Sequence, residues 1–254
     1  MRYLFEISYL GTNYAGWQSQ LNATGIQEVV EKCLSTVLRQ KLAIVGSGRT
    51  DAGVHCSQQF FHLDIDKPID REKLIVQMNS FLPNDIAIRS ISQIKPNISA
   101  RYDATERAYE YIITQKKDPL RIGRAFYFFK ETDVKTMNKA AALLVGTHDF
   151  EAFSKVKTDV NHFICTIKEA EWNQKGDLLV FNIAANRFLR GMVRAIVGTL
   201  LDTGTGKISL KEFQEILKSK DRKKAGMNVP PEGLYLIKVK YPKSIYIDGE
   251  RENQ

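Results

Sequence analysis

An aspartate and an arginine lie two residues apart in a glycine-rich segment, Gly46-Ser-Gly-Arg-Thr-Asp-Ala-Gly-Val-His55. A carboxylate such as that of Asp51 can act as a nucleophile and form a covalent intermediate. Glycines allow backbone conformations that other residues avoid, and they let another chain come close. The segment therefore predicts a loop that presents Asp51 and Arg49 from a fixed scaffold, where functional side chains are often found.

A simple turn is the alternative interpretation of the same segment. Asp-Ala-Gly is common turn chemistry, and the Asp51 side chain could bond its own backbone. Residues 42–45 before the segment and 58–65 after it both have the composition of strands. The local pattern does not separate the two interpretations, because both place the segment between two strands.

A second candidate charge lies in the most strongly patterned helix of the sequence. Apolar residues repeat at helical spacing from Leu189 to Leu201, and Gly204 and Gly206 mark the end of the helix. Arg194 interrupts this pattern close to its apolar stripe. An arginine near a core usually has a carboxylate partner, because an unpaired buried charge is costly. The alternative is that its side chain extends to solvent.

Aromatic and basic residues offer a third kind of chemistry. Tyr109 and Tyr111 lie two residues apart in a predicted strand at 107–114, so both face the same side. Such residues usually pack in a core, but an exposed tyrosine can also stack on a nucleobase. Two basic clusters, at 116–124 and 218–224, could follow a phosphate backbone or could be solvated surface.

Several other catalytic patterns do not occur in the sequence. No phosphate-binding loop and no nucleophile elbow is found. The histidines and cysteines lack ligand spacing, so neither a metal site nor a disulfide framework is predicted. The histidines, each interpreted as structural or surface residues, are His55, His62, His148 and His162, and the cysteines are Cys33, Cys56 and Cys165.

The composition is that of an ordinary globular protein. The chain has 254 residues, of which 43% are hydrophobic and 26% are charged. Lys and Arg outnumber Asp and Glu by 37 to 29, and this basic balance suggests a polyanionic partner such as nucleic acid. An odd number of separated cysteines fits a reducing cytoplasm. Without a signal peptide pattern or an apolar run of membrane length, we expect a cytoplasmic protein that uses no membrane.

The elements that must position these residues alternate along the chain. Short links between several predicted strands favour a largely antiparallel sheet, so the sequence predicts an α+β fold. Thr24 and Gln27 have the spacing of a capping box at the start of the first helix. Residues 146–153 are expected to form a compact turn. Strands are predicted at 2–10, 42–45, 58–65, 85–94, 107–114, 162–172, 177–186 and 234–241, and helices at 26–38, 71–81, 133–145, 189–204 and 209–218.

The chain is predicted to consist of two halves. Residues 1–100 form an N-terminal α/β half that carries the Asp51 loop, and residues 101–242 form a C-terminal α/β half. Two halves that share a sheet would leave a cleft between them. The polar segment 243–254 is expected to be a loose tail.

Taken together, the motifs resemble those of the bacterial tRNA pseudouridine synthases of the TruA type, over nearly the whole chain. Gly48-Arg-Thr-Asp-Ala-Gly-Val-His55 resembles the catalytic motif of that family. Any one motif alone would be weak, but their order and spacing together are specific. The other segments that resemble family motifs are 14–18, 25–27, 100–111, 146–153, 186–198, 225–226 and 233–236.

The resemblance implies a reaction in which uridine in tRNA becomes pseudouridine. The uracil is detached at N1 and rejoined to the ribose through C5, and no metal or cofactor takes part. The implied targets are positions 38, 39 and/or 40, at the foot of the anticodon stem. The resemblance also implies the pseudouridine synthase fold, with two similar halves, a shared and mainly antiparallel sheet and a central cleft, and a homodimer that holds tRNA.

The resemblance further implies a role for five residues. Asp51 is the nucleophile, and Arg194 pairs with it, which would favour the ionised carboxylate. Arg49 helps to displace the base, Tyr109 stacks on it, and Leu234 lines the pocket beneath it. Cys165 stands where many relatives have an arginine, which puts one contact with the RNA backbone in doubt.

Two other functions are compatible with parts of the pattern. An RNA-binding protein could use the same cleft without catalysis, although it would not need Asp51, Tyr109 and Arg194 together. A carboxylate-based hydrolase would need a second acid near Asp51, and no residue of the sequence is marked out as one.

Overall fold

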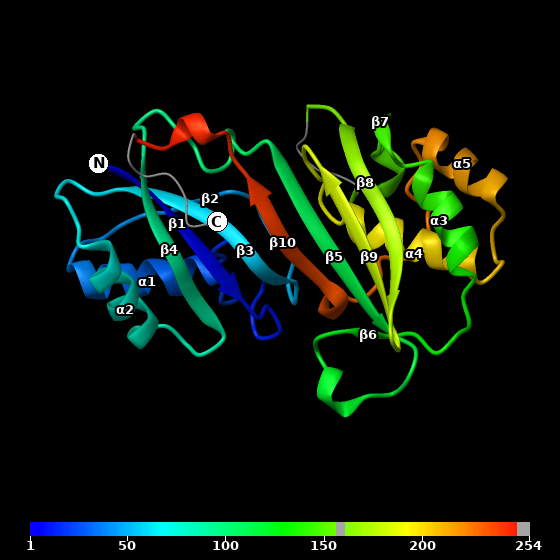
Figure 1. The fold of residues 1–254 in the computed structure, drawn as a ribbon, viewed down its shortest axis with the longest axis horizontal. Helices are drawn as coiled ribbons and strands as arrows, with labels where there is room; N and C mark the ends of the chain where they lie inside the picture. The colour runs from blue at the N-terminus through cyan, green and yellow to red at the C-terminus, as the bar shows by residue number, and fades with distance from the viewer. Residues whose placement is uncertain (156–160, 248–254) are drawn as a thin grey trace. The chain divides into compact units, whose positions relative to one another are not determined.

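The computed structural model describes residues 1–155 and 161–247, which group into two compact units. The first unit contains Met1–Thr105 together with the described part of Leu236–Gln254, and the second contains Glu106–Tyr235. Figure 1 labels the helices and strands of both units. Most of the last strand of the chain thus belongs to the same unit as the N-terminal residues. The predicted division into 1–100 and 101–242 follows the order of the chain and stays a prediction.

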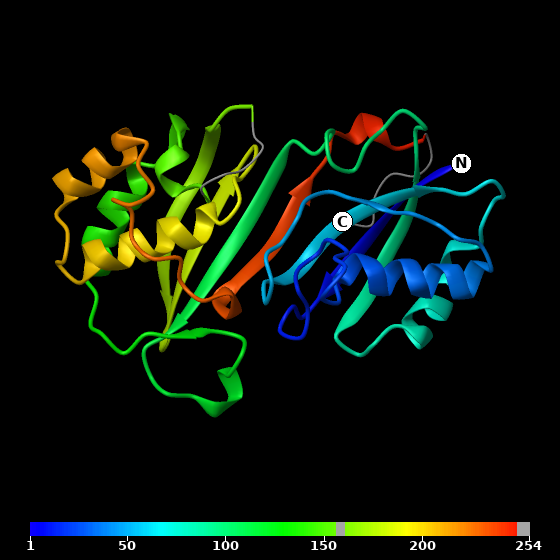
Figure 2. The same ribbon diagram turned by 180° about the vertical axis from the view of Figure 1, so that it is seen from behind.

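The first unit is a sheet with two helices. Its strands are β1 (Arg2–Tyr9), β2 (Val45–Gly46), β3 (His55–Asp64), β4 (Ile86–Ile94) and most of β10 (Leu234–Lys240), and its helices are α1 (Ile26–Leu38) and α2 (Arg71–Phe81). The strand order is β4-β1-β3-β10, and β2 pairs with β3. β1 is antiparallel to both of its neighbours. Figure 2 shows α1 in front of these strands.

The core of the first unit follows the apolar periodicity of its strands. Phe5 of β1 and Phe61 of β3 are fully buried and stack with their ring centroids 4.9 Å apart. Helix α1 buries one apolar stripe against the sheet, and Cys33 is a small residue of that stripe. In β4, Ile86, Ile88 and Ile91 are all buried.

Helix α1 is capped differently from the prediction. Its N-cap residue is Gly25, which has no side chain, so the predicted capping box of Thr24 and Gln27 is wrong. Instead, the first two N–H groups of the helix donate to the carbonyl oxygens of Gly16 and Trp17, at 3.0 and 2.8 Å. The first N–H groups of a helix have no partners within the helix, and here backbone carbonyls accept from them. These bonds hold the preceding segment against the N-terminus of α1.

The second unit is a sheet with three helices. Its strands are β5 (Glu106–Thr114), β6 (Phe126–Tyr127), β7 (Gly146–Asp149), β8 (Ile164–Lys175) and β9 (Leu178–Ala185), and its helices are α3 (Val134–Ala142), α4 (Met192–Gly204) and α5 (Leu210–Ser219). The strand order is β5-β9-β8-β7, with antiparallel neighbours, and β6 pairs in parallel with β5. Figure 2 shows α4 in front of this sheet.

Two local predictions in the second unit are wrong. Helix α3 ends at Ala142 rather than at 145, and Val145 is 44% exposed. Residues 146–149 are predicted to lie in a compact turn but form strand β7, which pairs with residues 164–167 of β8. Gly-Thr-His-Asp has the composition of a turn, so its strand conformation depends on the partner strand and not on its own propensity.

The described part of the C-terminal tail is packed. A 3-10 helix, η4, covers Lys243–Ile245, and Ile245 is 2% exposed. The N–H of Lys95 donates to the carbonyl of Ile245 at 3.0 Å. The prediction of a loose tail is therefore wrong for residues 243–247, and residues 248–254 lie outside the described residues.

The fold class is that predicted from the sequence. In both units helices alternate with strands whose pairing is mainly antiparallel, which confirms the α+β class. Within residues 1–155 and 161–247, no helix has the length and apolar character that crossing a membrane requires.

His62 makes the stability of the first unit sensitive to pH. Its Nδ1 accepts a hydrogen bond from the N–H of Ala100 at 3.0 Å, which a protonated Nδ1 could not do. Burial, with a smaller effect of the Arg2 charge, lowers the pKa of His62 below its ordinary value of 6.5. The neutral form therefore stabilises the fold above pH 6.5, and this contribution is lost as the pH falls from there towards the lowered pKa.

Urea titrations between pH 7.5 and pH 5 are expected to show this loss. The free energy of unfolding should fall with pH in the wild type and fall less steeply in His62→Gln, whose side-chain oxygen keeps an acceptor that does not titrate. His162→Gln, at an exposed position, is the control and should keep the wild-type slope. Equal slopes for the wild type and His62→Gln would contradict the assignment.

Candidate active site

Asp51 and Arg49 lie in the loop of residues 47–54 in the first unit. The loop connects β2 to β3, which begins at His55 and not at residue 58 as predicted. Arg49 is exposed and Asp51 is half-buried, and the N–H of Val54 donates to the carbonyl of Asp51 at 3.2 Å. The backbone at Asp51 is thus a turn, as the simpler interpretation expects, and this turn presents the carboxylate and the guanidinium.

A segment that precedes α1 holds the loop on both sides of Asp51. The N–H of Trp17 donates to the carbonyl of Thr50, and the N–H of Gly53 donates to the carbonyl of Tyr14, each at 3.2 Å. Gly16 has a φ of +92°, and a side chain at this position would collide with the backbone of Thr50. The glycine therefore allows two backbone segments to lie in contact and fixes the path of the loop.

Two glycines of the motif have different structural requirements. A Cβ atom at Gly46 would lie 2.6 Å from Cε2 of the buried Trp17, whereas a Cβ atom at Gly48 would meet nothing within 4 Å. Overpacking of this kind costs about 1–3 kcal/mol. We therefore expect Gly46→Ala to lower the free energy of unfolding by that amount and Gly48→Ala to change it by less than about 0.5 kcal/mol.

Thermal or urea unfolding of the two variants measures this difference, and each variant is the control of the other. A stable Gly48→Ala would show that the folded chain itself does not require a glycine at position 48. Space at this position is then open to a substrate that approaches the backbone. Equal destabilisation by the two substitutions would contradict the packing at Trp17.

The buried histidines of the first unit are structural. His55 is fully buried, and its Nδ1 accepts a hydrogen bond from the N–H of Gly11 at 3.0 Å. Together with the acceptor role of His62, this confirms the structural interpretation for both residues. In the part of the chain that the structure describes, no group of three or more His, Cys, Asp or Glu side chains could hold a metal ion.

Arg194 lies in the first turn of α4 and is bonded to a backbone carbonyl. Its Nε donates to the carbonyl of Val229 at 2.7 Å, and the N–H of Val229 donates to the carbonyl of Arg194 at 3.3 Å. The residue is half-buried. A carbonyl partner is an arrangement that neither sequence interpretation named, and it fixes the direction in which the guanidinium leaves the helix.

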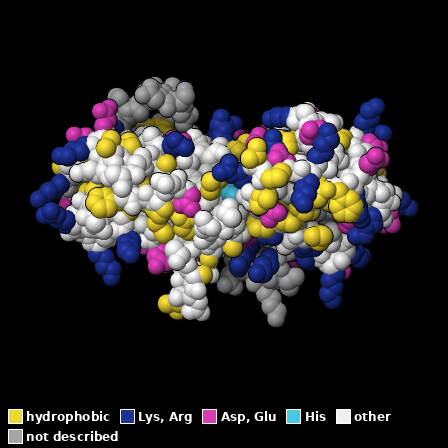
Figure 3. All heavy atoms as spheres, turned by 90° about the horizontal axis from the view of Figure 1, so that it is seen from below, with side chains coloured by type: hydrophobic (Ala, Val, Ile, Leu, Met, Phe, Trp, Pro, Cys, Tyr) yellow, Lys and Arg dark blue, Asp and Glu magenta, His cyan; other side chains and the backbone are white. Residues whose placement is uncertain are grey.

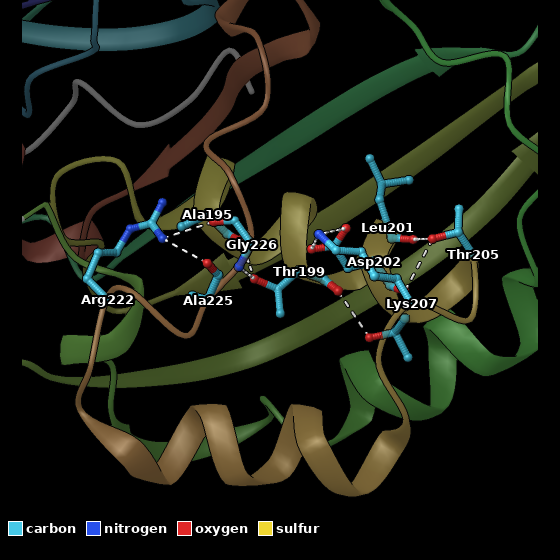
Figure 4. A network of polar contacts seen from close by, with 10 residues as sticks. Ala195, Thr199, Leu201, Asp202, Thr205, Lys207, Arg222, Ala225 and Gly226 are labelled. Carbon is cyan, nitrogen blue, oxygen red and sulfur yellow. Dashed lines mark hydrogen bonds and ion pairs between the residues drawn. The ribbon is translucent and has the colours of Figure 1, made fainter.

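The residues just before Val229 are held on α4, as Figure 4 shows for Ala225 and Gly226. Arg222 donates to the carbonyls of Ala225 and Gly226 at 3.3 and 2.9 Å, and the N–H of Gly226 donates to Oγ1 of Thr199 at 2.8 Å. A side chain at Gly226 would come within 3 Å of the helix backbone. Arg194 therefore has a rigid partner that lies directly against its own helix.

Tyr109 and Tyr111 of β5 differ in their surroundings. Tyr111 is fully buried, and its hydroxyl donates to the carbonyl of Pro230 at 2.7 Å. Burial, with a smaller effect of the Glu232 charge, raises the pKa of Tyr111 well above its usual value. Tyr109 is half-buried, and its ring packs edge-on against Phe188, with the ring centroids 5.1 Å apart. Tyr111 is thus a core residue, whereas Tyr109 keeps an accessible part.

Leu234 is buried at the start of β10, with 5% of its surface exposed. It follows a 3-10 helix, η3 (Pro231–Gly233), which lies against β5. A Cβ atom at Gly233 would be 2.7 Å from the carbonyl oxygen of Ile112 and 2.8 Å from the ring of Tyr111. Glycine is therefore needed for this approach, and the role of Leu234 beneath a base stays a prediction.

The five predicted site residues fall into two groups. Arg49 and Asp51 share one loop of the first unit, whereas Tyr109, Arg194 and Leu234 belong to the second unit. Within the second unit, the segment 229–234 ends at Leu234, and its carbonyls accept from Arg194 and from Tyr111, the core tyrosine of β5. The chemical roles of all five residues stay predictions.

Sequence reasoning missed several side chains that support these residues. Phe188 contacts Tyr109, and its place in the motif 186–198 could have marked it. The charge of Glu232 acts on the buried hydroxyl of Tyr111, but a lone glutamate after two prolines carries no signal of its own. Supports of this kind become visible when the fold brings their partners together.

The two basic clusters lie on the surface and are partly neutralised by ion pairs. Lys116 pairs with Asp177 at 2.9 Å, and Lys220 pairs with Asp149 at 2.8 Å. On the face seen in Figure 3, Lys and Arg side chains are scattered over both units. Phosphate binding by these clusters therefore stays a prediction beside the solvated alternative.

Cys165 and one hollow of the second unit lie apart from the predicted site residues. Cys165 is fully buried, and burial raises the pKa of its thiol to about 11. Its side chain is therefore not available to a phosphate backbone. The hollow, of about 280 Å³, contains none of the five site residues and is lined by Leu143, His148, Asp149, Gln214, Leu217, Lys218 and Lys220.

Comparison with known proteins shows which family this chain resembles over most of its length. The family model described as tRNA pseudouridine synthase matches residues 7–103 and 140–242. The chain is similar to tRNA pseudouridine synthase A of Porphyromonas gingivalis, with 44% identity over 97% of this chain and 99% of that protein. The enzyme of the same name from Bacteroides fragilis is 44% identical, over 96% of this chain and 98% of that protein. That of Parabacteroides distasonis is 43% identical, over 96% and 98%.

Proposed function

Because the chain belongs to the tRNA pseudouridine synthase family, it is an enzyme that isomerises uridine to pseudouridine in tRNA, and we propose that Asp51 is its nucleophile. We further propose that its targets are positions 38, 39 and/or 40 of the anticodon stem-loop. The observation that carries the nucleophile assignment is the placement of Asp51. It lies on a turn whose backbone is fixed on both sides, at Thr50 and at Gly53.

A nucleophilic carboxylate suits the proposed reaction. The bond between N1 and C1′ breaks, a bond between C5 and C1′ forms, C5 loses a proton, and N1 gains one. The change is an isomerisation, so no oxidant or reductant is needed. A covalent bond to Asp51 would hold one fragment while the base turns, and it would divide a difficult step into easier ones. The attacked atom is either C6 of the base or C1′ of the sugar.

The other four residues have proposed roles that agree with their surroundings. Arg194 pairs with the Asp51 carboxylate, and its bond to a rigid backbone carbonyl supports a fixed orientation. Arg49 is exposed and helps to displace the target base. Tyr109 stacks on that base with the support of Phe188 behind it, and Leu234 lines the pocket below. Fixed side chains lower the entropic cost of reaching the reactive geometry.

The substrate class follows from the family, whereas its finer features are proposals. The family acts on tRNA, and an excess of 8 positive charges suits association with a polyanion. We propose positions 38–40 because the resemblance to the TruA type implies them, and they suit the cost of flipping a nucleotide, which is a few kcal/mol and lowest where pairing is weak. A homodimer that holds one tRNA, and a cytoplasmic location, belong to the same proposal.

Position-specific labelling tests the target assignment. Each tRNA molecule carries tritium at C5 of one uridine only, which lies at position 38, 39 or 40. A control tRNA carries the labelled uridine in the acceptor stem. Tritium should be released as water from at least one of the three anticodon positions and not from the control. Release of free uracil would instead indicate hydrolysis, and binding without either product would indicate an RNA-binding protein.

A further inference from the structure

A buried polar connection links the sheet of the first unit to the loop that carries Asp51. Gln59 of β3 and Tyr9 of β1 are 0% and 4% exposed. The hydroxyl of Tyr9 donates to Oε1 of Gln59 at 2.8 Å, and Nε2 of Gln59 donates to the carbonyl of Gly48 at 3.1 Å. The Tyr9 hydroxyl also lies 2.8 Å from Oγ1 of Thr50. Because its single proton is given to Gln59, Thr50 is the donor in that contact.

The connection reaches the loop at two points beside the functional residues. Gly48 and Thr50 flank Arg49, and Thr50 directly precedes Asp51. The register of β1 against β3 shifts next to Tyr9, and such irregularities re-aim side chains at strand ends. The loop is therefore held from the sheet side by two side chains, in addition to the backbone bonds that fix it on the other side.

We propose that Gln59 is a positioning residue for Asp51, acting through the carbonyl of Gly48 and, by way of Tyr9, through Thr50. The inference rests on the proposed function, since it assumes that Asp51 reacts. An amide suits the position because it must accept from a hydroxyl and donate to a carbonyl at the same time. A buried polar group that loses its partner is costly, so the amide has one favourable orientation. In that orientation it holds the carbonyl of Gly48, and therefore the loop, in one position.

Gln59→Met tests whether the amide acts on the rate. Methionine has a similar shape and cannot make both bonds. We expect kcat to fall about 10- to 100-fold, because small displacements of a reacting group reduce rates by such factors. KM for tRNA should stay within about twofold, since the variant alters the reacting geometry and not a binding contact. Rates are measured at a temperature at which the variant is fully folded.

A second amide in the same unit, at an exposed position, makes the same pair of bonds and provides the control. Asn79 accepts from the N–H of Ile88 at 2.8 Å and donates to the carbonyl of Ile88 at 2.9 Å, so it bridges α2 and β4 with the same pair of bonds. Both of these bonds join Asn79 to Ile88, which lies outside the loop 47–54. Asn79→Leu should lower the melting temperature and leave kcat within about twofold of wild type. A fall in kcat that is equal in the two variants would reduce Gln59 to a stabilising residue.

Gln59→Glu tests the positioning role through the pH dependence of kcat, which a purely structural role would leave unchanged. A protonated carboxyl can both accept from Tyr9 and donate to Gly48, whereas an ionised carboxylate cannot donate. Burial at this fully buried position raises the pKa of a carboxyl above its ordinary value, so the ratio of the variant kcat to the wild-type kcat should decrease as the pH rises from 6 to 8.5. The neighbouring Cys56 thiol does not titrate in this range, because burial raises its pKa well above the usual value. Tyr9→Phe should lower kcat without such a pH dependence.

The outcomes separate this inference from the proposed function. If the wild type releases no tritium from any C5-labelled tRNA, the proposed function fails before Gln59 is considered. If the wild type is active and Gln59→Met keeps a kcat within twofold of it, the positioning role is overturned. A Gln59→Glu variant that matches Gln59→Met at every pH would overturn it as well.

Discussion

An Asp51→Ala variant is expected to form pseudouridine at less than about one thousandth of the wild-type rate, with a tRNA dissociation constant within about threefold of wild type. Asp51 is the only acidic residue of the loop 47–54, so no neighbour in that loop can replace its carboxylate. The backbone of Thr50 and Gly53 fixes the loop through bonds to Trp17 and Tyr14. Alanine should therefore leave the loop in place and remove the reacting group.

Nucleoside analysis of digested tRNA measures the product, and filter binding measures the affinity. Asp64→Ala is the matched control, because its carboxylate lies in the same unit and accepts from Arg2 at 2.9 and 2.7 Å, away from the loop. It should keep activity within about twofold, as expected of an exposed ion pair. Loss of binding together with activity in Asp51→Ala would contradict the nucleophile assignment, as would a measurable rate.

Substitution of Arg194 by lysine is expected to reduce kcat about 10- to 100-fold, with little change in tRNA affinity. The guanidinium has several donors in a planar fork, and one of them, Nε, is bonded to the carbonyl of Val229. A lysine ammonium is a compact charge, and it cannot keep that bond and reach a carboxylate with a fixed planar geometry. Single-turnover rates at saturating enzyme isolate the chemical step.

Arg2→Lys is the control for this substitution. Arg2 lies outside both basic clusters, and its guanidinium pairs with Asp64 and donates to the carbonyl of Ile98 at 2.8 Å, so the same change of side chain should keep the rate within about twofold. A wild-type rate in Arg194→Lys would remove Arg194 from the active site. A loss that is equally large in both variants would point to a general effect of arginine replacement on tRNA binding.

Much of the fold could be predicted from the sequence because apolar periodicity reports burial directly. Helix α2 occupies 71–81 as predicted, and Asp70 caps it through a bond to the N–H of Lys73. The failures occur where contacts between distant segments decide the structure. Helix α1 is capped by carbonyls of residues 16–17, and β7 is a strand because β8 lies beside it. No local pattern contains such partners.

Candidate site residues could be named from the sequence by their type, whereas the groups that support them could not. Asp51 and Arg49 stand out in a glycine-rich motif, and Arg194 stands out as a charge beside an apolar stripe. The carbonyl of Val229 could not be named as the partner of Arg194, because a backbone group carries no sequence signal. Gln59 likewise reads as an ordinary strand residue until the fold places its amide between two strands and a loop.

The most direct test of the central claim is tritium release from tRNA that carries uridine labelled at C5, with wild type and Asp51→Asn compared at equal occupancy of tRNA. Asparagine keeps the size of the side chain and removes the nucleophilic carboxylate, so the comparison isolates the proposed chemistry. We predict release by the wild type and none by Asp51→Asn. Release by both proteins at similar rates would contradict the role of Asp51, and release by neither, with tRNA bound, would contradict the isomerisation itself.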